Sequence, residues 1–112
     1  MSLFESTEQV LKIEVLTLGE FDPCVPGFYK NVKSFPFEVK KRRAIKVEIK
    51  TDFPIDIVIA NERGSPLLHK QGVNNETIGP VPTEDNKEMG IILGINPGDK
   101  ATVNVGVWMV KQ

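Results

Sequence analysis

Residues 44–60 have the sequence AIKVEIKTDFPIDIVIA, and this stretch decides the fold class. Between 45 and 49 apolar residues alternate with lysine and glutamate, which is the period-two pattern of a strand with one buried face. After a short turn at 52–54, isoleucine again occupies every second position from 55 to 59. Two adjoining strands therefore follow one another, and the fold is predicted to be built from β-structure.

Similar alternation predicts further strands at residues 9–18, 35–39, 89–95 and 101–109. Within the first of these, Leu11, Ile13 and Val15 are expected to face the core. Turn-forming residues separate the strands, most clearly in Asn96-Pro97-Gly98-Asp99. The sequence thus predicts one all-β domain over residues 1–112.

The expected architecture is an antiparallel sandwich of jelly-roll or Greek-key type with about six to eight strands. A closed barrel would give the same strand pattern. Only within residues 2–11 are apolar residues spaced as on one face of a helix. A short N-terminal helical turn is therefore the alternative to a strand in this part of the chain. Residues 72–87 show little periodicity and contain several turn residues, so they predict a long loop that crosses between sheets.

Residues 35–59, FPFEVKKRRAIKVEIKTDFPIDIVI, resemble the core of the bacterial and archaeal pre-peptidase C-terminal domain and related small jelly-roll modules. That family has an F-x-F-x-V strand, a short hairpin, a second alternating strand and a D-x-D-I-x-I strand. The chain departs from this pattern in two places. It has Lys41-Arg42-Arg43 where the family has glycine, and its residues 97–101 differ from the Gly-Thr-Tyr motif that the family has there. The resemblance implies a non-catalytic sandwich used for binding or stabilisation, often attached to secreted enzymes.

The charge balance argues against a nucleic-acid partner. Fourteen basic and fifteen acidic residues give a net charge of −1, without the basic excess of a nucleic-acid binder. No apolar run is long enough for a transmembrane helix, so no membrane partner is expected. The start of the chain lacks a signal-peptide pattern and Cys24 has no disulfide partner, which predicts a cytoplasmic protein. A secreted fragment whose signal had been removed is the alternative.

Neither a catalytic site nor a metal centre is predicted. Cys24 and the only histidine, His69, could form a nucleophile–base pair, but Cys24 equally suits a small apolar filler in a proline-rich loop. A zinc or copper site needs more cysteine and histidine ligands than these two residues provide, so no metal or other cofactor is expected. Acidic residues at 84–88 leave calcium as an alternative to a solvated loop. The chain is therefore predicted not to be an enzyme.

Two features suggest binding. Lys41, Arg42 and Arg43 belong to a basic run predicted to be a hairpin tip, where they either contact an anion or keep sheet edges from pairing. Trp108 alternates with the apolar set of the last strand, so it is expected on the opposite face of its sheet. Trp is common at binding hot spots, and Tyr29 would join Trp108 if its loop folds over that face.

The leading functional hypothesis is a non-enzymatic sandwich that binds a partner protein or a second copy of itself. A dimer through an edge strand or the Trp108 face would be typical. A module that binds carbohydrate or another small ligand is the alternative, and a small Cys- or acid-dependent enzyme is the third hypothesis.

Overall fold

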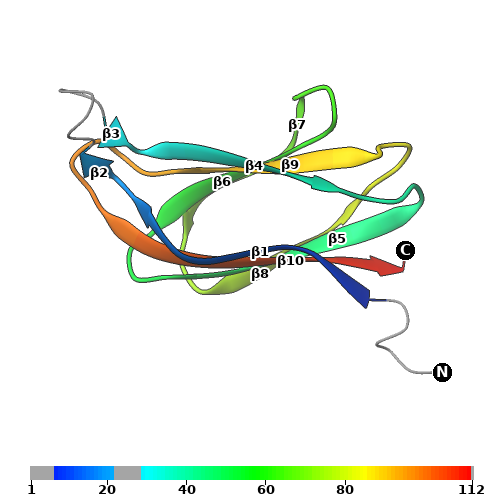
Figure 1. Ribbon diagram of the computed structural model, residues 1–112, viewed down its shortest axis with the longest axis horizontal. Coiled ribbons are helices and arrows are strands. Elements are labelled where there is room, and N and C mark those ends of the chain that lie inside the picture. Colours follow the sequence, from blue (N-terminus) through cyan, green and yellow to red (C-terminus); the bar gives the residue numbers. More distant parts are fainter. Residues whose placement is uncertain (1–6, 22–28, 112) are drawn as a thin grey trace.

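The computed structural model describes residues 7–21 and 29–111, all of which lie in strands or their connections (Figure 1). The strands are β1 (Thr7–Leu18), β2 (Glu20–Phe21), β3 (Tyr29–Lys30), β4 (Val32–Glu38), β5 (Arg43–Thr51), β6 (Ile55–Ala60), β7 (Pro66–Val73), β8 (Glu76–Pro82), β9 (Glu88–Gly94) and β10 (Ala101–Lys111). These ranges contain no helix long and apolar enough to cross a membrane.

Eight of these strands form two antiparallel four-stranded sheets that stack as layers (Figure 1). One has the order β1-β10-β5-β8 and is called the β10 sheet below; the other, β4-β9-β6-β7, is called the β9 sheet. Strands β2 and β3 form a short separate ribbon. The predicted antiparallel β-sandwich is confirmed, and because no ladder joins the two sheets, the barrel alternative is wrong for the described strands.

The core lies between the sheets, where the alternating apolar residues of both layers meet. Ile45, Val47 and Ile49 on β5 are fully buried, as the sequence pattern predicts. The β9 sheet contributes the opposite wall through Met89, Ile91 and Leu93, among others. All described strands of the sandwich supply side chains to, or pack against, this one apolar cluster.

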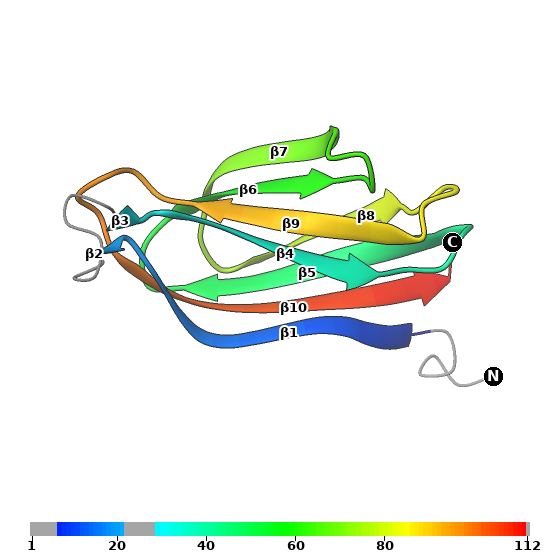
Figure 2. The ribbon, with the colours of Figure 1, turned by 45° about the horizontal axis from the view of Figure 1, so that its top comes forward.

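Consecutive sandwich strands lie in different sheets, except for β6 and β7, which pair with each other in the β9 sheet (Figure 2). The expectation of a hairpin tip at residues 40–43 is therefore wrong. Strand β4 pairs with β9, whereas β5 pairs with β10 and β8, so residues 40–43 cross from one sheet to the other. Alternation along a strand defines its buried face but carries no information about its partner.

The long loop expected at 72–87 is also wrong, because this interval contains β8. Its inward residues are Ile78 and Val81, which pair with Val47 and Ile45 of β5. A bulge at Gly79 and Pro80 separates these two residues by three positions instead of two, so the period-two pattern disappears. Strand β7 was missed as well, since it is an edge strand with mostly exposed residues.

Strand β1 departs from the expected pattern in its middle. Register shifts lie between Gln9 and Leu11 and between Ile13 and Leu16. The second shift turns Val15 outward, where it is 72% exposed with a positive φ, so its predicted core position is wrong. Residues 7–11 of the helical alternative belong to this strand, and its earlier residues lie outside the described part of the chain.

Candidate functional site

Trp108 lies on the outer face of the β10 sheet, as its alternation predicts. Its register partners are Gln9 on β1 and Lys46 on β5, so it has a neighbouring strand on each side and lies toward the end of β10. The indole leans back along β10 and covers Gly106: a Cβ on that glycine would lie only 2.4 Å from the ring atoms Cη2 and Cζ3. Glycine at 106 is therefore what allows the ring to rest on the strand, half-buried.

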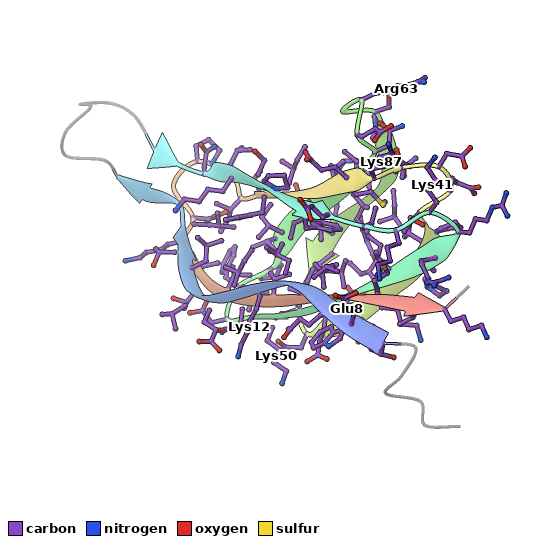
Figure 3. The ribbon with its side chains drawn as sticks, turned by 45° about the vertical axis from the view of Figure 1, so that its right-hand side comes forward. Glu8, Lys12, Lys41, Lys50, Arg63 and Lys87 are labelled. Atoms are coloured by element: carbon purple, nitrogen blue, oxygen red, sulfur yellow. The ribbon has the colours of Figure 1, made fainter. Side chains whose placement is uncertain are left out.

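A shallow groove of about 290 Å³ continues from Gly106 along the same face. Two exposed ion pairs border it: Lys12 with Glu14 at 3.0 Å, and Lys50 with Glu48 at 3.6 Å. Figure 3 shows Lys12 and Lys50 projecting side by side from this sheet. Asn104 also lines the groove, and its Oδ1 accepts a hydrogen bond of 3.0 Å from the backbone N–H of Val15. The residues that line the groove thus include two lysines and two glutamates, next to apolar side chains such as Ile13 and Val105.

The basic residues Lys41, Arg42 and Arg43 lie at one end of the sandwich, where β4 crosses to β5 (Figures 2 and 3). Their side chains are exposed, and the backbone beneath them is fixed by Thr83, which is fully buried. The Thr83 hydroxyl donates to the carbonyl of Lys40 at 2.7 Å and accepts from the N–H of Arg43 at 2.9 Å.

The acidic loop of residues 84–88 packs against this basic turn. The N–H of Arg42 donates to the carbonyl of Glu84 at 2.9 Å, which brings Glu84 and Asp85 beside the basic run. Opposite charges therefore gather at this end of the molecule, and they offset the cationic character that an anion site would need. Among the described residues, no three His, Cys, Asp or Glu side chains are placed to hold a metal ion.

Tyr29 and Trp108 are not brought together. Tyr29 pairs with Phe21 in the β2–β3 ribbon, at the opposite end of the sandwich from the end of β10 (Figure 1). His69 lies exposed on β7 and pairs with Val58. Cys24 lies outside the described residues. The structure therefore separates the aromatic face, the basic turn and the β2–β3 ribbon into three places.

The outer face of the β9 sheet is a feature that the sequence analysis did not identify. It is built from three rows across the strands, and we call it the β9 face: Pro36-Gly90-Ala60-Pro66, Ser34-Ile92-Val58-His69 and Val32-Gly94-Asp56. Antiparallel sheets with one solvated face normally carry polar residues there. Here Asp56, at a corner, is the one charged residue of the three rows. The signal was present in the sequence, because β6 and β9 carry apolar residues on both faces.

The β9 face is partly open to solvent. Val32 is 61% exposed, and Leu67, which lies next to the face at a bulge of β7, is 45% exposed. A groove of about 270 Å³ runs over its end beside the β6–β7 turn, bordered by Pro36, Ala60 and Gly90. This face therefore combines exposed apolar groups with two glycines on its central strand β9.

Each edge strand of the two sheets is interrupted. β1 has two register shifts, β7 has two and β8 has one. β4 carries Pro36 in its middle, which lacks an N–H for a further ladder. Such interruptions hinder the addition of another strand. The predicted route to a dimer through an edge strand is thus disfavoured by the geometry.

A comparison with models of known protein families gives no match for this chain, and a comparison with curated proteins gives none either.

Proposed function

We propose that this chain is a non-enzymatic interaction module that associates with a second copy of itself through the β9 face. The observation that carries the proposal is the Gly90-Ile91-Ile92-Leu93-Gly94 segment of β9. The outward-facing residues of this segment are two glycines with a half-buried isoleucine between them. β9 is a central strand, and the row of residues that crosses it at this isoleucine contains no charged side chain. Exposed apolar patches of this kind commonly mark interaction sites.

The two glycines are not needed by the monomer. A Cβ built on Gly90 would meet the Phe35 carbonyl oxygen at 3.5 Å, which is an ordinary contact, and Gly94 has similar room. Neither has a positive φ, and β9 has regular register with both neighbours. Glycine inside a strand weakens it, but suits a place where another backbone approaches closely. The glycines therefore favour a partner that approaches from outside the sheet.

A second copy fits this face better than a charged partner. The centre of the face is uncharged, so two copies can stack there without bringing like charges together. The isoleucine at 92 projects between the hollows at 90 and 94, which gives a surface that complements itself in an isologous dimer. Sheets that stack in this way pack about 10 Å apart.

Charges at one end of the face favour one orientation. Glu38 and Glu88 lie directly opposite each other in the β4–β9 ladder, just beyond the first row. A two-fold axis along the strands would place these carboxylates beside their copies, whereas an axis across the strands sends them to opposite ends. Like charges in contact are unfavourable, so we propose the axis across the strands, since the opposite end of the face carries only one acidic residue, Asp56.

The size of the face sets the expected strength. Four strands about 4.8 Å apart and seven residues long give a flat area of about 440 Å² per copy. A stable interface buries about 800 Å² per partner. We therefore propose a weak, concentration-dependent dimer rather than an obligate one.

The strand order supports the finer assignment of the sandwich as a jelly roll. In the orders β1-β10-β5-β8 and β4-β9-β6-β7, successive strands alternate between sheets around one hairpin, as two Greek keys require. The fold alone assigns no function, so the proposal depends on the β9 face.

Sedimentation equilibrium over a range of protein concentrations tests the proposal. Ile92→Lys places a charge on the β9 face and should make the protein monomeric at all concentrations. Val110→Lys is the matched control, since Val110 is also an outward, half-buried residue of a central strand, but of the β10 sheet. It should leave the dimer intact. A wild-type protein that stays monomeric at about 1 mM, or a dimer that Ile92→Lys leaves unchanged, would refute the proposal.

A further inference from the structure

The two outer faces of the sandwich differ in chemistry, and the second face carries a second site. We infer that Trp108 and the groove beside it bind a neutral, polyhydroxylated ligand, of which carbohydrate is the chemical class. This site lies on the β10 sheet, on the other side of the molecule from the β9 face. The inference is therefore independent of the proposed dimer.

The indole supplies an apolar surface next to polar groups. One side of the ring rests on Gly106, and Gly106 is also one of the residues that line the groove, so the ring lies beside one end of the groove. A sugar ring has a face of C–H groups that packs on an aromatic ring, while its hydroxyls extend sideways. Trp combines such an apolar surface with a polar N–H, which suits a partly wet site.

The polar groups of the groove match hydroxyls rather than a charged ligand. Lys12 and Lys50 supply donors and Glu14 and Glu48 supply acceptors, so the four charges cancel. A phosphate or an acidic polymer would meet two carboxylates, and a cation would meet two ammonium groups. A hydroxyl both donates and accepts, so a neutral polyol can use both kinds of group at once.

The amides extend this pattern. Asn104 uses its Oδ1 to hold the backbone of Val15, which fixes the side chain and leaves its NH₂ group for a ligand. Gln9 contributes a second amide where the groove meets Trp108. The groove volume of about 290 Å³ lies at the lower limit of ligand sites. We therefore expect one or two sugar units to be in contact, with dissociation constants of about 0.1–10 mM.

Trp108 is the only tryptophan of the chain, so its fluorescence reports on this site alone. The test is a fluorescence titration of the full chain with cellopentaose, laminaripentaose and chitopentaose, each up to about 20 mM. An oligogalacturonate of equal length serves as the acidic comparison. At least one neutral oligosaccharide should give a saturable change, and the acidic one should give none.

Variants then locate the site. Glu48→Ala removes an acceptor that lines the groove and should raise the dissociation constant about tenfold. Glu88→Ala, which removes an exposed glutamate from a strand of the other sheet, should leave it unchanged, and so should the monomeric Ile92→Lys variant. Binding by Trp108→Ala, followed by NMR, should be lost. No response to any neutral oligosaccharide, a response to the acidic one alone, or binding that persists in Trp108→Ala would each overturn the inference.

Discussion

Replacing Gly90 with threonine should strengthen the fold and weaken the dimer at the same time. In the monomer, the nearest atoms to a new Cβ are the Phe35 carbonyl oxygen at 3.5 Å and Pro36 Cα at 3.9 Å, so a Cβ at this position makes only ordinary contacts. The backbone at this position has no positive φ. Threonine also suits a strand, whereas glycine loses more conformational freedom when the chain folds.

These terms give the expected magnitudes. Relief of the glycine entropy contributes about 0.5–1 kcal/mol, and the strand preference of threonine adds up to about 1 kcal/mol. We therefore expect the free energy of unfolding to rise by about 1 kcal/mol. In the proposed dimer, however, the new side chain enters a close contact, where overpacking costs about 1–3 kcal/mol. The dissociation constant should rise at least about fivefold.

Urea denaturation followed by circular dichroism measures the first effect, at a concentration where the protein is monomeric. Sedimentation velocity measures the second. Gly90→Ala provides a graded control, because its smaller side chain should weaken the dimer less than threonine does. A Gly90→Thr protein that is less stable than wild type, or that associates as strongly, would show that the glycine serves the monomer and that our reasoning about the β9 face is wrong.

Three further predictions concern the monomer. Thr83→Val leaves two backbone groups under the basic turn without their hydroxyl partner and should cost about 2–3 kcal/mol in urea denaturation, whereas Thr83→Ser should recover most of the loss. Gly106→Ala should displace the Trp108 ring and destabilise the protein by about 1 kcal/mol; in a Trp108→Ala background the cost should disappear, as a double-mutant cycle would measure. Lys70→Met breaks an ion pair with β8 that joins the two sheets, but because both groups are partly exposed its effect should stay below about 0.5 kcal/mol.

The regular part of the fold was predictable because burial on one side imposes strict alternation. Strands such as β5 and β10 keep one apolar face from end to end, and their residues were identified without knowledge of their partners. The prediction failed where the backbone leaves this period. The bulge at Gly79 and Pro80 interrupts the alternation of β8, so the sequence pattern did not reveal this strand. The register shift between β1 and β10 near Val15 turns this apolar residue outward.

The candidate site was predictable in part for a related reason. The alternation of inward and outward residues along β10 placed Trp108 on the outer face. The role of Gly106, however, depends on the direction in which the indole lies along the strand, which no sequence pattern gives. The β9 face was missed because apolar residues at 58 and 92 looked like part of an ordinary buried strand. Alternation places both residues opposite the buried positions, but it does not show that this face of the sheet is left partly open to solvent.

An NMR dilution series tests the β9 face most directly, since it follows each backbone amide as the protein concentration changes. The account predicts concentration-dependent shifts centred on Ser34, Val58 and Ile92, with little change at Trp108 or along β1 and β8. Shifts that cluster on the β10 sheet or on an edge strand, or spectra that do not change with concentration, would contradict it.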